Sequence, residues 1–128
     1  MIKLVYCLRR LPHLSLAEFQ RYWLQQHGPL VRSLTGALRI KRYVQVHTLD
    51  HPLNEALRRS RDAAEPYDGV AELWWESADE MAAATATPEG QKAARDLRED
   101  ERNFIDFATS SLWIAEEHEV VGGPGQVE

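Results

Sequence analysis

The chain has 128 residues, with 44% hydrophobic and 27% charged side chains and a net charge of −5. These values describe one globular domain and exclude a fibrous repeat or a chain that is disordered throughout. The acidic balance argues against a nucleic-acid partner, and no apolar run is long enough to cross a membrane.

The N-terminal residues predict a strand followed by a helix. Apolar residues alternate over 2–10, and because this strand begins without a secretory leader we expect a cytoplasmic protein. Cys7 is the single cysteine, which excludes an internal disulfide and a cysteine-based zinc site. Ser15 and Glu18 have the spacing of a capping box, which predicts a helix over 15–27.

The first helix is expected to break where Gly28-Pro29 interrupts its apolar stripe. Proline removes a backbone donor and crowds the preceding turn, so we expect only a short continuation over 30–35, closed by Gly36. The residues after this glycine predict a second strand over 38–48, with valine on one side and polar or aromatic side chains on the other.

The second half of the chain predicts two strands and two more helices. Residues 49–68 are expected to form a long connection with at most one helical turn, followed by a strand over 69–76. Ser77 begins a short alanine-rich helix, and Pro88 stands at the favoured first position of a longer one. The last strand is predicted over 111–121.

This order of elements predicts an α+β domain over residues 1–121, with a flexible tail over 122–128. Strand, helix, strand, strand, helix, strand is the ferredoxin-like βαββαβ arrangement, a four-stranded antiparallel sheet with both helices on one face. The other face needs water, a second subunit or a ligand to cover it. The side chains expected on that open face are Tyr43, Gln45, His47, Val70, Glu72 and Trp74.

Several motifs resemble the EthD family, and together they extend over residues 2–121. They are the capping-box helix start, the segments Tyr22-Trp23, His27-Gly28-Pro29-Leu30 and Arg42-Tyr43, and the run over 67–77. The resemblance implies a dimeric α+β barrel, in which the sheets of two subunits pack face to face and enclose a pocket. A homodimer would then cover the open sheet face.

The resemblance also implies two pocket residues that handle protons. His27 matches a histidine that borders the pocket in cofactor-free isomerases of this superfamily, although the helix dipole also favours histidine at a helix end. Tyr43 matches a pocket tyrosine that orients or protonates an oxyanion, although an ordinary aromatic residue at a dimer interface has the same pattern.

Three further residues are candidates for a second acid–base group. His47 is expected on the same strand face as the tyrosine, and His51 follows it in the loop. Glu72 beside an aromatic side chain can act as a general base, or it forms an ion pair with Arg9 or Lys41 across the sheet.

The other expectations concern the walls of the pocket and the charged surface. The residues expected to bind substrate are Tyr22, Val70, Trp74, Gln45 and His51. The charged run over 95–102 is expected to be a solvated helix face. No metal-binding motif accompanies the histidines, so no metal site is expected.

These observations predict a cofactor-free, homodimeric enzyme that uses histidine and tyrosine in acid–base chemistry. The substrate is expected to be a small hydrophobic carbonyl compound (aromatic, lactone or polyketide-like), and the reaction an isomerisation, dehydration, cyclisation or oxygenation. One alternative is a protein that binds such a compound without transforming it. Another is a haem protein with His27, His47 or His118 as axial ligand.

Overall fold

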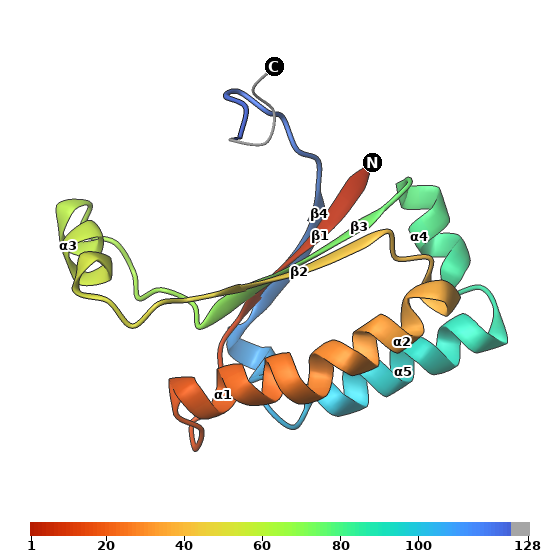
Figure 1. The fold of residues 1–128 in the computed structure, drawn as a ribbon, viewed down its shortest axis with the longest axis horizontal. Coiled ribbons are helices and arrows are strands. Elements are labelled where there is room, and N and C mark those ends of the chain that lie inside the picture. The colour runs from red at the N-terminus through yellow and green to blue at the C-terminus, as the bar shows by residue number, and fades with distance from the viewer. Residues whose placement is uncertain (124–128) are drawn as a thin grey trace.

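The computed structural model describes residues 1–123 and contains one antiparallel sheet with helices packed on one of its faces (Figure 1). The strands are β1 (Ile2–Leu8), β2 (Arg42–His47), β3 (Gly69–Trp75) and β4 (Ser111–Ala115), in the spatial order β2-β3-β1-β4. The fold is therefore the predicted ferredoxin-like α+β fold. Of the tail expected over 122–128, residues 124–128 lie outside the described part of the chain.

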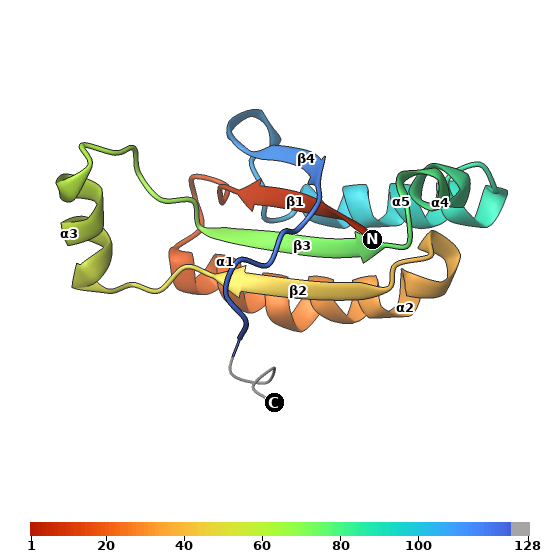
Figure 2. The same ribbon diagram turned by 90° about the horizontal axis from the view of Figure 1, so that it is seen from above.

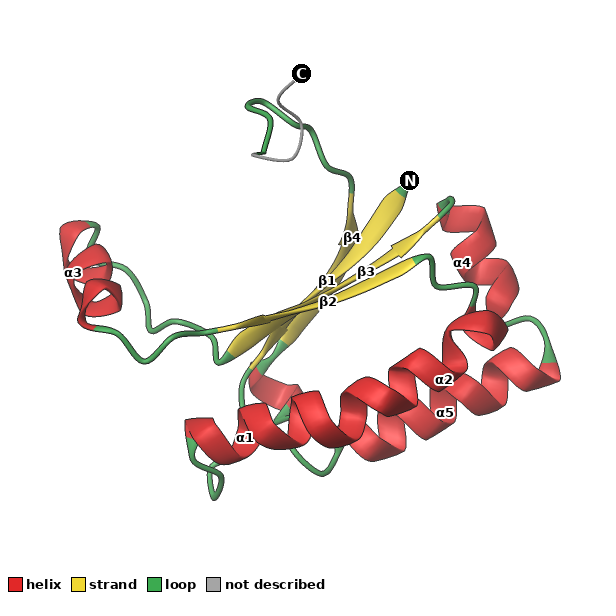
Figure 3. Ribbon diagram, in the orientation of Figure 1, coloured by secondary structure: helices red, strands yellow, loops and turns green. Residues whose placement is uncertain are grey.

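The helices are α1 (Leu16–Tyr22), α2 (Gly28–Leu38), α3 (Pro52–Ser60), α4 (Ala78–Ala84) and α5 (Pro88–Glu101), with a short 3₁₀ turn at Phe107–Thr109. Figure 3 shows α1, α2 and α5 lying along one face of the sheet, with α4 at one end. The core lies between these two layers. Its largest fully buried side chains are Leu8, Phe19, Trp23, Val31 and Phe104. Within residues 1–123, no helix has the length and hydrophobicity that a membrane span requires.

The first helix begins as predicted but does not break at Gly28-Pro29. Ser15 and Glu18 form a complete capping box at its start. A π-helical turn at Trp23–His27 then joins α1 to α2, and the N–H of Gly28 donates to the carbonyl of Trp23, five residues back. The wider turn accommodates the proline, so the prediction of an interruption was wrong.

The end of α2 also differs from the prediction, which placed it at Gly36. The helix continues to Leu38, and Arg39 ends it in the left-handed conformation with φ of 59°. Gly36 has no positive φ, so it does not have the backbone conformation of a helix-terminating glycine.

The two strands β2 and β3 share a register that corrects the predicted open face. Tyr43 lies opposite Leu73, and Gln45 opposite Ala71, on the face that the helices cover. Tyr43, Gln45 and His47 were expected on the open face, and this expectation was wrong. Val70, Glu72 and Trp74 do lie on the open face, opposite Val46, Val44 and Arg42.

Residues 116–121 were expected to continue the last strand, but β4 ends at Ala115. The following residues leave the sheet on the side opposite the helices (Figure 1) and pass over it toward β2 (Figure 2). A carboxylate oxygen of Glu117 accepts a hydrogen bond of 2.6 Å from the indole N–H of Trp74 on the open face.

The connection over 49–68 is an arm that carries α3, a longer helix than the single turn expected. Both Figures 1 and 2 show α3 held away from the sheet and the other helices. Ion pairs of Glu55 with Arg58 and Arg59, three and four residues along, stabilise α3 locally. His51 caps its first turn, and its Nδ1 accepts from the N–H of Leu53 at 3.0 Å.

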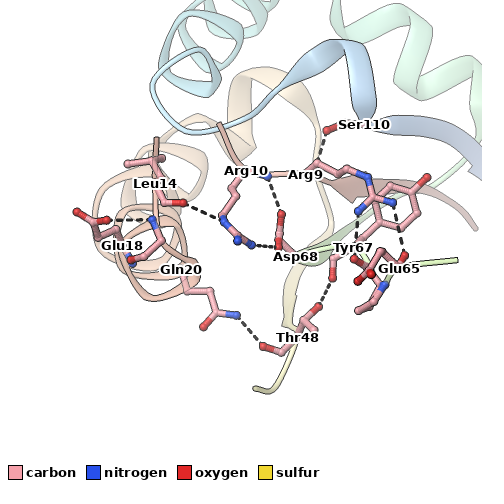
Figure 4. Close-up of polar contacts among 12 residues, drawn as sticks. Arg9, Arg10, Leu14, Glu18, Gln20, Thr48, Glu65, Tyr67, Asp68 and Ser110 are labelled. Atoms are coloured by element: carbon pink, nitrogen blue, oxygen red, sulfur yellow. Dashed lines mark hydrogen bonds and ion pairs between the residues drawn. The ribbon is translucent and has the colours of Figure 1, made fainter. Parts of the chain in front are cut away.

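Polar contacts fix the base of this arm to the body of the protein (Figure 4). Asp68 forms an ion pair with the guanidinium of Arg10 and accepts from its backbone N–H at 2.7 Å. The Thr48 hydroxyl joins the two legs of the arm by donating to the carbonyl of Tyr67 at 2.6 Å. Arg9 lies over the Tyr67 ring, with the guanidinium carbon 4.3 Å from its centre.

Candidate functional site

A small cavity of about 150 Å³ lies inside the helix-covered half of the molecule, between the sheet and the helices. Most of its lining is apolar core, including side chains of β1, α2 and β3. Besides the indole N–H groups of two tryptophans, the polar groups of the lining belong to Tyr6, His27, Tyr43 and Glu101. A few polar groups in an apolar enclosure are typical of a small-molecule site.

The cavity adjoins a larger apolar cleft of about 650 Å³ near α4, α5 and β4. The six residues that line both are Tyr6, Leu38, Trp75, Leu97, Glu101 and Leu112. The cleft is open to solvent, and this shared wall separates it from the cavity.

His27 is the best-positioned proton acceptor in the cavity. It ends the π-helical turn and is only 5% exposed. Its Nδ1 lies 2.7 Å from Oδ2 of Asp100, and because an ionised carboxylate only accepts hydrogen bonds, Nδ1 carries the proton. Its Nε2 has no hydrogen-bond partner among residues 1–123. Burial lowers the pKa of His27 despite the opposing effect of Asp100, which favours a neutral imidazole with a free lone pair.

Asp100 is itself held in place by hydrogen bonds. The hydroxyl of Tyr22 donates to its Oδ1 at 2.6 Å, and the amide of Asn103 donates to that hydroxyl at 3.0 Å. Burial opposes ionisation of Asp100, but hydrogen bonds from Tyr22 and His27 outweigh it and hold its pKa below the usual value. Tyr22, predicted as a pocket wall, therefore lies behind the carboxylate instead of lining the cavity.

Tyr43 and Glu101 supply the other polar groups of the cavity. Burial raises the pKa of Tyr43 to about 12, so the phenol keeps its proton at neutral pH. The Glu101 carboxyl accepts from the hydroxyl of Tyr6 at 3.2 Å, and burial raises its pKa to about 7. A carboxyl of this kind can give or take a proton near neutrality.

The structure separates Glu72, Trp74 and Val70 from this cavity, because they lie on the opposite face of the sheet. Glu72 accepts from the ammonium of Lys3 at 2.7 Å, so it is paired, but with neither of the predicted partners. The Trp74 ring lies under the guanidinium of Arg42 at 4.6 Å. The roles predicted for these side chains in a pocket formed with a second subunit stay predictions.

His47 and Gln45 lie on the helix side but outside the cavity, in a shallow groove along β2. The His47 ring stacks on Trp23, with ring centres 4.5 Å apart, and its Nε2 lies 2.8 Å from Oε1 of Gln45. His51 lies at the base of α3 beside a different groove. His118 is exposed and lies 3.1 Å from a carboxylate oxygen of Glu116. Within residues 1–123, no three His, Cys, Asp or Glu side chains are grouped to hold a metal ion.

The sequence reasoning missed Asp100 and Glu101, which it assigned to a solvated helix face. Ala93, Leu97 and Glu101 are spaced by four residues, so the glutamate continues the apolar stripe of α5. That spacing was the available signal. A carboxylate on the buried stripe of a helix is rare unless it has a partner or a function.

Comparisons with known proteins agree with this fold. An EthD family protein from Bacillus halodurans C-125 is 20% identical, with a TM-score of 0.60, covering 92% of this chain and 99% of its own. A dimeric protein with a ferredoxin-like fold from Bacteroides fragilis NCTC 9343 is 9% identical, with a TM-score of 0.56, covering 91% and 95%. SnoaB, a cofactor-independent oxygenase from Streptomyces nogalater, is 14% identical, with a TM-score of 0.51, covering 95% and 97%. At these identities the likeness concerns the fold alone.

No curated protein matches the chain. A family model, in contrast, covers most of it. The match runs over residues 11–108 and is described as the EthD domain. This span includes the capping box, the π-helical turn and the His27–Asp100 pair, and the chain therefore belongs to the EthD family.

Proposed function

We propose that the protein is an enzyme that moves protons on a small apolar carbonyl compound, with His27 as the base. The observation that carries this proposal is the His27–Asp100 pair beside an apolar cavity. The carboxylate fixes one nitrogen of the imidazole and leaves the other free, which is the arrangement that a general base needs.

The proposed step begins when Nε2 of His27 takes a proton from a carbon next to the substrate carbonyl. The electron pair of that C–H bond moves to the carbonyl oxygen and forms an enolate. The hydroxyl of Tyr43 donates a hydrogen bond to this oxygen, where negative charge develops. Glu101, when protonated, returns a proton at a second carbon for an isomerisation, or to a departing hydroxyl for a dehydration.

Cyclisation and oxygenation remain within this proposal, because both start from the same carbanion. In a cyclisation the carbanion attacks a second carbonyl of the substrate, and in an oxygenation it reacts with molecular oxygen. The fold similarity to a cofactor-independent oxygenase supports including the second reaction. No part of the proposed proton transfer requires a cofactor.

We also propose that the protein works as a homodimer, with the open sheet face as the interface. That face carries the apolar side chains Val5, Val44, Val70 and Trp113, which no described residue of the same chain fully covers. A two-fold pair is the commonest way to bury such a face. The dimeric neighbour of similar fold supports it.

Proton abstraction can be tested without knowing the natural substrate. A panel of small ketones, β-keto esters and unsaturated lactones is incubated with the protein in D₂O, and deuterium incorporation is followed by NMR. We expect at least one compound to exchange, and His27→Gln to slow that exchange by about 10² to 10⁴. The matched control is His118→Gln, which changes an exposed histidine outside the cavity.

The alternative of a non-catalytic binding protein makes a different prediction. Compounds of the panel would then bind to the wild type and to His27→Gln with equal affinity, and none would exchange deuterium. That result would overturn the proposed catalysis and retain the cavity as a binding site.

A further inference from the structure

The side-chain amide of Gln45 has one orientation that satisfies its neighbours. One end of the amide lies 2.9 Å from the backbone carbonyl of Trp23 and 2.8 Å from the hydroxyl oxygen of Tyr43. Because a carbonyl oxygen can only accept, the end that faces Trp23 must be the NH₂ group. The Trp23 carbonyl also accepts from the N–H of Gly28 in the π-helical turn. Because a carbonyl oxygen has two lone pairs, it can accept both hydrogen bonds.

This orientation determines what the Tyr43 hydroxyl can do. An amide NH₂ group donates and does not accept, so the oxygen of Tyr43 is the acceptor in the contact with Gln45. The hydroxyl hydrogen of Tyr43 is then left over, and within residues 1–123 it has no acceptor. Tyr43 lines both the cavity and the groove along β2, so an oxygen atom of a molecule bound there can supply the missing acceptor.

The other end of the amide fixes a second proton. Oε1 of Gln45 lies 2.8 Å from Nε2 of His47, and because Oε1 can only accept, the proton of neutral His47 is on Nε2. Stacking on the Trp23 ring holds this imidazole parallel to the indole, with an interplanar angle of 16°. His47 and the Trp23 carbonyl therefore hold the amide from both ends.

We propose that Gln45 is a positioning residue that makes Tyr43 a hydrogen-bond donor to the ligand and thereby selects ligands with an acceptor oxygen, such as ketones and lactones. The amide takes an acceptor position of the Tyr43 oxygen and leaves the hydroxyl hydrogen to donate to the ligand. This inference rests on the proposed function, since it places the ligand in the same cavity.

The experiment uses acetophenone labelled with ¹³C at its carbonyl as the probe. A carbonyl that accepts a hydrogen bond absorbs in the infrared at a lower wavenumber than a free one. We expect a low wavenumber with the wild type and a higher one with Tyr43→Phe, which removes the donor. The affinity for acetophenone should fall about fivefold to tenfold in Tyr43→Phe, as expected for the loss of one hydrogen bond.

Gln45→Glu tests the direction of the amide. Its carboxylate accepts the Tyr43 hydrogen, so the probe should absorb at the same wavenumber as with Tyr43→Phe although the hydroxyl is present. The matched control, Gln91→Glu, adds the same charge on the exposed side of α5 and should leave the wavenumber unchanged. If Gln45→Glu does not fold, Gln45→Met replaces it. Methionine has a side chain of similar length but no amide to direct the Tyr43 hydroxyl. The probe wavenumber should then lie between those of the wild type and Tyr43→Phe.

Nitrogen NMR of His47 gives a readout that needs no ligand. We expect protonation at Nε2 in the wild type and a loss of this preference in Gln45→Met. Protonation at Nδ1 in the wild type would overturn the inference, as would equal probe wavenumbers with the wild type and Tyr43→Phe. A shifted wavenumber without deuterium exchange would instead retain Tyr43 as a donor and remove the proposed catalysis. Failure of acetophenone to bind would overturn the inference, whereas deuterium exchange with another compound of the panel would retain the proposed function.

Discussion

His27 and Asp100 meet across two helices that are far apart in the sequence, with Nδ1 of the imidazole 2.7 Å from Oδ2 of the carboxylate. Hydrogen bonds lower the pKa of the aspartate, and burial lowers the pKa of the histidine and favours its neutral form. The imidazole of this pair lines a largely apolar cavity. The pH dependence of the proposed reaction follows from this arrangement.

The rate of the proposed isomerisation should rise and then fall as the pH increases. The rise comes from His27, which must be neutral to accept a proton and whose pKa lies below its usual value of 6.5 because of burial. The fall comes from Glu101, which must be protonated to return a proton and whose pKa is about 7. The measurement is kcat/KM against pH for a β,γ-unsaturated ketone, whose isomerisation needs both the proton removed by His27 and the proton returned by Glu101. His27→Gln should remove the rising limb of the profile, and Glu101→Gln should remove the falling limb. A rising limb that persists in His27→Gln would assign the base to another group.

Asp100→Asn should slow exchange more than it weakens binding. Asparagine has an oxygen at only one of the two carboxylate positions, so its NH₂ group faces either Nδ1–H of His27 or the hydroxyl of Tyr22. We expect kcat to fall about tenfold to a hundredfold, the range known for carboxylates that orient a metal-bound histidine, while KM changes little. Asp96→Asn is the control, since this carboxylate pairs with Lys92 on the surface. Equal kinetics in both variants would contradict the positioning role of Asp100.

Glu101 should make the protein less stable at alkaline pH. Its pKa is about 7 in the folded state against an ordinary value of 4.5, so the folded state holds the proton more tightly than the unfolded state. The favourable contribution is complete below pH 4.5 and is lost as the pH rises through 7. At pH 8, the free energy of unfolding of Glu101→Gln, measured by urea denaturation, should therefore exceed that of the wild type by about 2 kcal/mol. At pH 4 the two proteins should show little difference in this free energy. The exposed control, Glu99→Gln, should show the same pH dependence as the wild type.

The sequence predicted the order of the elements because each has a local signal. Ser15 and Glu18 mark a helix start within four residues, and Pro88 marks another. The faces of β2 were not predictable in the same way. Valines lie on one side of this strand and a tyrosine on the other, so apolar side chains point both ways and the pairing register decides which side is buried.

The candidate site was predictable only in part, for a related reason. His27 and Tyr43 were singled out and line one cavity, although their catalytic role stays a prediction. Asp100 and Glu101 were hidden in a run of charged residues, where composition indicates a solvated surface and only the four-residue spacing from Leu97 indicates burial. This end of α5 is held against the core by the hydrogen bond from Tyr6 to Glu101 and by the contact of the neighbouring Phe104 ring with His27.

Two glycines should respond in opposite ways to alanine. A methyl group on Gly69 would overlap the ring of Trp23, which is fully buried and cannot move aside. Gly36 lies in α2 with open space around it, where alanine favours the helix. We expect Gly69→Ala to lower the free energy of unfolding by about 2 kcal/mol and Gly36→Ala to raise it by about 0.5–1 kcal/mol, measured by urea denaturation. Two equal values would contradict the packing of Trp23 on β3.

The open sheet face should be the dimer interface. Val44→Asp places an unpaired charge on this face beside Glu72 and should weaken dimerisation about a hundredfold or more. Leu24→Asp, on the helix side, is the control and should leave the dimer intact. Sedimentation velocity at micromolar concentration gives the answer. A wild-type protein that sediments as a 14.7 kDa monomer would remove the proposed interface.

The π-helical turn between α1 and α2 amounts to one residue inserted into a regular helix. Deleting any residue within it would restore ordinary helical spacing and rotate everything before the deletion by about 100° relative to everything after it. Phe19 would then leave the core while Val31 stayed in it. The length of this segment is therefore fixed more strictly than its composition, and relatives that share the cavity should keep this spacing even where the side chains between Trp23 and His27 differ.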